Sequence, residues 1–227
     1  MKNIVLYSLM FSTVISATNC KPGITDNLPV CESTILSFIN NPSGNWQIGY
    51  STGSVLDTGQ FALCTFAGMD SLIGIWHPSG QQAGYYPYTG QNNTGSTQVD
   101  ATLSWTARPG EIVMEGSGSG QYSMLRFRVP LSGKYRIKVI FEGVHFRLST
   151  TDVHVLLNAQ SLFSDNINGY GGDSLFHAIV GPHPTSTYKG ILQLQQNDEL
   201  TFAVGYGSDG TNYNDTTGLL IYIELVG

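Results

Sequence analysis

One short segment of the chain gathers aromatic side chains of the kind that stack on sugar rings. Trp76 is followed by Tyr85, Tyr86 and Tyr88. An exposed ring offers an apolar surface to the C–H faces of a sugar, while amide groups can bond its hydroxyls. Such amides occur nearby at Gln81, Gln82, Asn92 and Asn93. The segment therefore predicts a sugar-stacking loop; the alternative is that the tyrosines only close one end of the fold, with their hydroxyls in water.

Polar side chains also alternate along two segments that read as strands. Asp152 and His154 are two residues apart, and so are Arg126 and Arg128. Side chains at positions i and i+2 of a strand project from the same face. If the two strands are neighbours, we expect these groups either to line a concave sugar groove or to pair with one another across the sheet.

A third segment is rich in oxygen atoms that could bind a metal. Asp209, Asn212, Asn214 and Asp215 lie close together in the sequence. Calcium binds six to eight oxygens from carboxylates, amides and backbone carbonyls, so the segment predicts a structural calcium site. Its spacing differs from that of an EF-hand loop, which ends in a glutamate at its twelfth position. The alternative is an Asx-rich turn whose side chains bond to its own backbone.

Catalytic signatures are weak in this sequence. The histidines are scattered and lack the His-x-His spacing of a metal site. Gly116–Gly120 resembles the Gly-x-Ser-x-Gly turn of serine hydrolases only superficially, because its central residue is Gly118. Asp152 could form a glycosidase pair with Glu142 or with Asp215. We therefore expect a protein that is not an enzyme, and a hydrolase with paired carboxylates is an alternative.

Composition narrows the class of partner. The 227-residue chain has a formal net charge of −6, and charged residues make up 11% of it, against about 25% in an average soluble protein. Phosphate contacts need a basic surface, so the composition argues against general binding of nucleic acid or of anionic membranes. A hydrophobic content of 41% is enough to form a core. Low charge and 27 glycines favour an all-β secreted protein.

Residues 1–19 are typical of a secretory signal peptide. A lysine precedes a mostly apolar stretch over residues 4–15, which would span only about 18 Å as a helix, against a hydrocarbon core about 30 Å thick. Signal peptidase could cut after Ala17, or the segment could act as a relaxed lipoprotein signal that leaves Cys20 acylated. Both alternatives predict an extracytoplasmic protein, secreted or lipid-anchored in the cell envelope, with residues 20–30 as a tether.

The three cysteines fit an exported protein. If Cys20 carries lipid, Cys31 and Cys64 are left as one possible disulfide in an oxidising compartment. The alternative is that Cys64, which ends an apolar run, is a small buried hydrophobic residue.

The remaining residues, 31–227, read as one domain built from short strands. Apolar residues alternate with period two, which is typical of strands that bury one face. We expect about ten strands, packed as a single antiparallel β-sandwich of jelly-roll type. Residues 81–100 and 165–184 read as long surface loops. The clearest alternating segments are 123–129, 135–141, 153–157, 202–206 and 219–225.

An ordered series of motifs runs through this domain. They are NPSGNWQIGY at 41–50, ARPG at 107–110, YSMLRFRVP at 122–130, TDVHVLLN at 151–158, NGYG at 168–171, FAVGYG at 202–207 and NDTTGL at 214–219. In order and spacing, the series resembles a jelly-roll module of secreted bacterial proteins, some of which end in a short sorting tail. The resemblance covers about residues 35–227. It implies carbohydrate binding and the structural calcium found in many such modules. The chain ends at Glu224–Gly227 without such a tail, which favours a lipid anchor or plain secretion.

Taken together, the sequence predicts a non-catalytic, extracytoplasmic module that binds a glycan or polysaccharide and belongs to a lipoprotein. We expect its contacts at Trp76, Tyr85, Tyr86 and Tyr88, with polar support from the three strand residues Asp152, His154 and Arg126. One alternative is a structural or adhesive cell-envelope protein that binds a protein partner. Another is a glycoside hydrolase. No nucleic acid is expected to bind, and membrane contact is expected only through the lipid anchor.

Overall fold

The computed structural model describes residues 39–70, 73–78, 86–100, 105–145, 147–170 and 185–226. The expected signal peptide and tether, with Cys20 and Cys31, lie outside these ranges, and those predictions stay untested. Among the described residues, no helix is long and apolar enough to cross a membrane.

Short strands dominate the described chain, whose one helical element is a single 3-10 turn, η1 (Thr58–Gln60). The strands are β1 (Trp46–Ser51), β2 (Phe61–Leu63), β3 (Phe66–Asp70), β4 (Ile73–His77), β5 (Tyr88–Gln91), β6 (Gln98–Asp100), β7 (Trp105–Ala107), β8 (Ile112–Glu115), β9 (Ser123–Arg128), β10 (Gly133–Gly143), β11 (Leu148–Ser149), β12 (Asp152–Leu157), β13 (Gln160–Asn166), β14 (Gly169–Tyr170), β15 (Thr185–Leu194), β16 (Glu199–Val204) and β17 (Thr217–Leu225).

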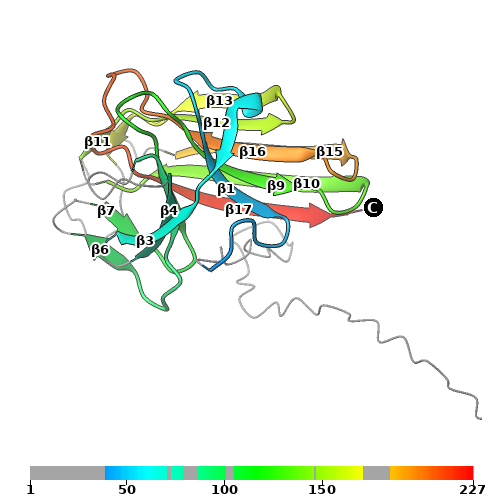
Figure 1. Cartoon of the computed structure of the whole chain (residues 1–227), viewed down its shortest axis with the longest axis horizontal. Coiled ribbons are helices and arrows are strands. Elements are labelled where there is room, and N and C mark those ends of the chain that lie inside the picture. The colour runs from blue at the N-terminus through cyan, green and yellow to red at the C-terminus, as the bar shows by residue number, and fades with distance from the viewer. Residues whose placement is uncertain are drawn as a thin grey trace, which may run out of the picture. The chain divides into compact units, whose positions relative to one another are not determined.

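Thirteen of these strands form two large antiparallel sheets that pack face to face, and the other four form two short pairs, β6 with β7 and β11 with β14 (Figure 1). The six-stranded sheet has the order β13-β12-β16-β9-β1-β2, and the seven-stranded sheet has the order β15-β10-β17-β8-β5-β4-β3. From β15 onward, successive strands belong to alternate sheets, as expected of a jelly roll. The prediction of an all-β, antiparallel sandwich of jelly-roll type is confirmed.

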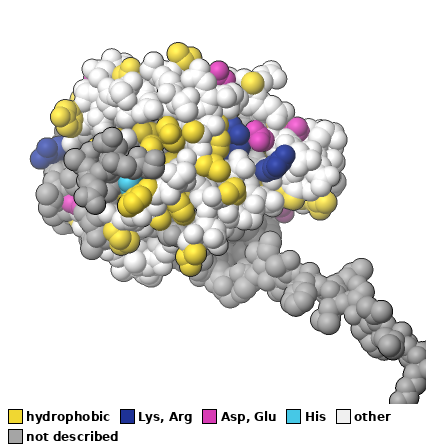
Figure 2. Space-filling model, viewed as in Figure 1, with side chains coloured by type: hydrophobic (Ala, Val, Ile, Leu, Met, Phe, Trp, Pro, Cys, Tyr) yellow, Lys and Arg dark blue, Asp and Glu magenta, His cyan; other side chains and the backbone are white. Residues whose placement is uncertain are grey.

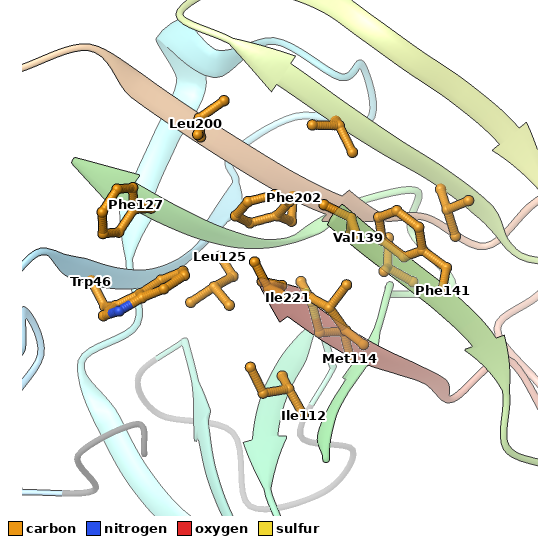
Figure 3. Close-up of a cluster of buried hydrophobic side chains, with 14 of the residues drawn as sticks. Trp46, Ile112, Met114, Leu125, Phe127, Val139, Phe141, Leu200, Phe202 and Ile221 are labelled. Carbon is orange, nitrogen blue, oxygen red and sulfur yellow. The ribbon is translucent and has the colours of Figure 1, made fainter. Parts of the chain in front are cut away.

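The alternating sequence pattern decides which side chains enter the space between the sheets. In β10, Tyr135, Ile137, Val139 and Phe141 are buried there, because side chains two apart in a strand share a face. Figure 3 shows how side chains from both sheets meet in this core. The six-stranded sheet contributes Trp46, Leu125, Phe127, Leu200 and Phe202, and the seven-stranded sheet contributes Ile112, Met114, Val139, Phe141 and Ile221. Each fully buried side chain of this size stabilises the fold by about 1.5–3 kcal/mol.

The outer face of each sheet is covered in part. On the seven-stranded sheet, Ile73, Ile75, Tyr88 and Val113 form a second buried cluster. The residues that cover them are Trp105 and Ala107 of β7, together with Val144. On the six-stranded sheet, Met124, Leu156 and Ala203 are packed under Leu56, Phe61 and Tyr122. Among the described residues, neither of these two clusters includes a residue of β10, β15 or β17.

Cys64 is buried, with 2% of its surface exposed, and its thiol is free in this structure. Burial raises the pKa of the thiol to about 12. We therefore expect iodoacetamide to modify Cys64 very slowly in the native protein and rapidly in denaturant. The predicted partner, Cys31, is not among the described residues, so the bond stays a prediction. If Cys64 remains unmodified in denaturant until a reductant is added, Cys64 forms a disulfide and its assignment as a free thiol is wrong.

Candidate functional site

The predicted aromatic loop does not assemble as a stacking surface. Trp76 is 6% exposed and points into the core between the sheets, and Tyr88 is 1% exposed beneath β7. Both residues lie in strands, where alternation buries them, and not in a loop. The prediction that they stack on sugar is therefore wrong. Tyr86 is 38% exposed, with its ring centroid 5.7 Å from that of Tyr88, and Tyr85 lies outside the described residues.

Arg126 is likewise unavailable to a ligand. Its guanidinium pairs with Glu199 Oε2 at 3.0 Å and donates to the carbonyl of Thr58 at 3.0 Å. It also stacks over the ring of Phe61, 3.9 Å from the centroid, and the residue is 7% exposed. Arg126 therefore fastens the segment around η1 onto the outer face of the six-stranded sheet. The prediction that it contacts a sugar is wrong, because the segment that covers it was not foreseen.

Asp152 and His154 do project from one face of β12, as predicted, and they bind each other. His154 Nε2 lies 2.7 Å from Asp152 Oδ2. The backbone amide of Gly207 donates to Asp152 Oδ1 at 2.8 Å, and the Tyr122 hydroxyl donates to the same carboxylate. The Tyr122 and His154 rings meet edge to face, with centroids 5.7 Å apart. We call the group of Tyr122, Asp152, His154 and Gly207 the loop-end site.

The electrostatics keep Asp152 ionised. Burial alone would raise its pKa, but the hydrogen bonds from His154, Gly207 and Tyr122 outweigh burial and hold the pKa below its usual value. Burial and the charge of Asp152 raise the pKa of the Tyr122 hydroxyl, which keeps it protonated as a donor. Asp152 and His154 keep 20% and 13% of their side-chain surfaces exposed. The loop-end site is thus a preorganised carboxylate beside two rings, with access to solvent.

Strand pairing explains why these residues meet. Val153 of β12 pairs with Val204 of β16, which in turn pairs with Ser123 of β9. The neighbouring residues Asp152, Gly205 and Tyr122 are therefore adjacent in space. A Cβ atom at Gly205 would lie 2.2 Å from Asp152 Oδ1 and 2.6 Å from Tyr122 Cε1, so only glycine allows the contact. The sequence pattern did not identify Tyr122, because its position depends on the spatial order of the strands.

The predicted calcium ligands do not act as one set. Asp209 is exposed and accepts a hydrogen bond from the Thr211 amide at 3.0 Å, as in an Asx turn. The Asn212 amide donates toward Glu115 Oε1 at 3.4 Å, and Asn214 adopts a positive φ of 69°. Asp215 is fully buried. Within the described ranges, no three His, Cys, Asp or Glu side chains gather as a metal-binding group.

Asp215 has an unusual environment for a carboxyl group. Its Oδ1 accepts a hydrogen bond from the Thr150 amide at 3.0 Å, while Oδ2 has no hydrogen-bond partner among the described residues. Burial, with smaller contributions from the charges of Asp209 and Asp152, raises its pKa to about 7. Asp215 therefore lies near enough to the loop-end site to sense the charge of Asp152.

The two carboxylate pairs proposed for hydrolysis are poorly placed for it. Glu142 is on β10 in the other sheet and is paired with Arg108, which also binds the buried Glu111. Asp215 interacts with Asp152 but has no exposed surface. A glycosidase pair must flank a glycosidic bond that enters between its two carboxyl groups. Neither pair offers that access in this structure.

An apolar patch lies elsewhere on the surface. Figure 2 shows hydrophobic side chains gathered over the middle of the face that is viewed in Figure 1. On the edge strand β3, Phe66 is 45% exposed and Met69 is 61% exposed, and the Phe66 ring lies 4.7 Å from that of His77. A hollow beside these residues is lined by Ala67, Gly68, Met69, Ile73, Gly74, Gln91, Asn93 and Thr94.

Comparison with known proteins gives distant matches. No family model and no curated protein matches the chain. A CBM4 structure is similar with 11% identity, 61% of this chain and 85% of that chain covered, and a TM-score of 0.32. A carbohydrate-binding module, CBM36, in complex with calcium and xylotriose gives 12% identity, 61% and 98% coverage and a TM-score of 0.31. Rabbit GITRL gives 10% identity, 60% and 80% coverage and a TM-score of 0.26. At these scores, the likeness carries no argument about this chain.

Proposed function

We propose that the chain is a non-catalytic, extracytoplasmic module that binds a neutral glycan at the loop-end site. The observation that carries the proposal is an ionised carboxylate, Asp152, held beside the rings of Tyr122 and His154 and open in part to solvent. A sugar hydroxyl can donate to a fixed carboxylate while its ring packs on an aromatic side chain. Hydrogen bonds from Gly207 and Tyr122 fix the carboxylate before a ligand arrives, which lowers the entropic cost of binding.

The binding test uses the full chain against a panel of neutral polysaccharides and oligosaccharides. Asp152→Asn keeps the shape of the side chain but removes the charge, so we expect it to weaken binding by at least about tenfold, since hydrogen bonds to charged groups contribute about 1.5–3 kcal/mol. Tyr86→Ala is the matched control, because it removes an exposed aromatic ring that is not in the site.

Two outcomes of this panel would contradict the proposal. One is that Tyr86→Ala abolishes binding while Asp152→Asn has no effect, which would return the site to the aromatic segment. The other is that no neutral glycan binds a chain whose melting temperature shows that it is folded.

Extracytoplasmic placement and the lipid anchor rest on the pattern of residues 1–20. We propose that Cys20 is the acylated first residue of the exported protein. Mass spectrometry of the membrane-extracted protein is expected to find an acylated N-terminal Cys20. An unmodified N-terminus at Thr18 would instead identify a secreted protein.

Calcium enters the proposal as an accessory ion. Asp209 is exposed, and the Oδ2 atom of Asp215 has no hydrogen-bond partner among the described residues, so these two carboxylates are the proposed ligands. Asn212 is not included, because its side chain bonds to Glu115. Melting temperatures measured in calcium and in EDTA test this directly. A higher melting temperature in calcium than in EDTA, with the difference lost in Asp209→Asn, would support the site. Equal melting temperatures in calcium and in EDTA would exclude it.

A protein-binding function is the second candidate, and the exposed Phe66 and Met69 of β3 favour it. Unpaired edge strands with apolar side chains are suited to contact with another protein. Retention of a specific partner by the chain, lost in Phe66→Ser with Met69→Ser, would favour this candidate over glycan binding.

A further inference from the structure

The outer face of β10, β15 and β17 carries a cluster of basic side chains, of which Lys134 and Lys189 are exposed. The inward residues of these strands belong to the main core, so the alternate residues point away from it. Every lysine in the described part of the chain lies here, at Lys134, Lys138 and Lys189, together with Arg136. We call these four residues the basic face. They stand in contrast to the net charge of −6 of the whole chain.

The strand register places these charges side by side. Lys138 pairs directly with Lys189 of β15 on one side and with Tyr222 of β17 on the other. Its Nζ lies 5.6 Å from the centroid of the Tyr222 ring. Arg136 is bound to Glu224 at 2.6 Å, whereas no carboxylate of a described residue pairs with any of the three lysines. Like charges directly opposite each other destabilise a sheet, so this arrangement has a cost that folding does not explain.

Protection of a sheet edge accounts for only part of the cluster. β15 is the edge strand of the seven-stranded sheet, and a lysine there hinders pairing with another chain. That reason applies to Lys189. It does not apply to Arg136 and Lys138, because β10 lies inside the sheet between β15 and β17.

The spacing of the charges fits an extended anion. Residues two apart along a strand are separated by about 6.8 Å, and neighbouring strands are about 4.8 Å apart, so the lysines form a flat array. Ile191, 56% exposed, and Tyr222 add apolar surface between the charges. A flat array with apolar surface is complementary to a sugar chain that carries repeated negative charges. A single aromatic ring is a poor platform for stacked nucleic-acid bases, which argues against a nucleic acid as the ligand.

We propose that the basic face binds a linear acidic polysaccharide, whose carboxylate or sulfate groups pair with Lys134, Lys138 and Lys189. This surface shares no residue with the loop-end site, so the two proposals stand or fall separately. One chain could then hold a neutral and an acidic segment of cell-surface or matrix glycan at two places.

The test measures binding of the full chain to polygalacturonate, which carries carboxylates, and to dextran sulfate, at several salt concentrations. The double variant Lys138→Gln with Lys189→Gln is expected to weaken binding to one or both polymers at least about tenfold and to reduce the salt dependence by about two charges. Arg128→Gln is the matched control, because it removes one exposed charge from the outer face of the opposite sheet. Unchanged binding of that control supports a specific face.

Several results would overturn the proposal. A loss in Arg128→Gln that is half or more of the loss in the double variant, measured in free energy of binding, would show general charge attraction. Absence of binding to both acidic polymers would also contradict it. So would a double variant that loses binding to anionic lipid vesicles or to DNA but still binds both polymers as the wild type does. Asp152→Asn separates the two sites, because it is expected to weaken binding of neutral glycans only. If it has no effect on that binding, the proposal for the loop-end site fails and the proposal for the basic face is unaffected.

Discussion

Gly207→Ala is expected to lower the free energy of unfolding by more than about 3 kcal/mol and to disrupt the loop-end site. The backbone at Gly207 has a φ of +71°, and a Cβ atom there would lie 1.1 Å from the carbonyl oxygen of Thr150. An alanine can be accommodated only if the backbone moves, which would also withdraw the Gly207 amide from Asp152. Chemical denaturation of the wild type and the variant measures the loss.

Gly210 provides the matched control for this substitution. It lies in the same loop with a φ of +75°, but a Cβ atom there would meet no atom within 4 Å. Gly210→Ala therefore includes the backbone strain without the collision, and we expect a loss of about 1–2 kcal/mol. Equal losses for the two variants would show that the close approach to Thr150 is unimportant.

Asp215 is expected to make the protein less stable as the pH rises from about 4 to 7. The pKa of the unfolded group is about 3.9, and the folded pKa is raised to about 7. The folded state therefore holds the proton more tightly than the unfolded state, so its stabilising contribution is complete below pH 4 and is lost as the pH approaches 7. At about 1.4 kcal/mol per unit, the loss from this group is at most about 4 kcal/mol.

Asp215→Asn tests this pH dependence. The amide resembles the protonated acid, so the variant is expected to match the wild type near pH 4 and to exceed its free energy of unfolding at pH 8. Asp209→Asn should move the wild-type transition to lower pH, because the charge of Asp209 contributes to the raised pKa. The lowered pKa of Asp152 acts only below about pH 4, where that group loses its stabilising charge. A constant difference between Asp215→Asn and wild type across pH 4–8 would contradict this account.

The strand pattern of the sequence predicted the sandwich well, because alternation alone decides which face of a strand is buried. The inward sets of β10 and β17 are those that the period-two pattern identifies. Alternation failed at Tyr88, where the segment read as a loop is strand β5 and its outward side chain is covered by β7. Coverage of a face by a distant segment leaves no local signal in the sequence.

The loop-end site, too, could be predicted from the sequence only in part. The pairing of Asp152 with His154 could be predicted, since it depends only on two positions of one strand. The contributions of Tyr122 and Gly207 could not, because they arise from the order β12-β16-β9 and from the loop that follows β16. Arg126 looked equally available in sequence, but it pairs with Glu199 of the neighbouring strand β16 and stacks on Phe61 of β2.

The most direct test of the loop-end site is a map of backbone amide chemical shifts in the full chain, titrated with a short oligosaccharide from the neutral glycan that binds best. Binding at the site is expected to shift the amides of Tyr122, Asp152, His154 and Gly207, with small changes on the basic face. Shifts that cluster around Phe66 and Met69, or around Tyr86, with none at Asp152 and His154, would contradict a glycan site at this end of the sandwich.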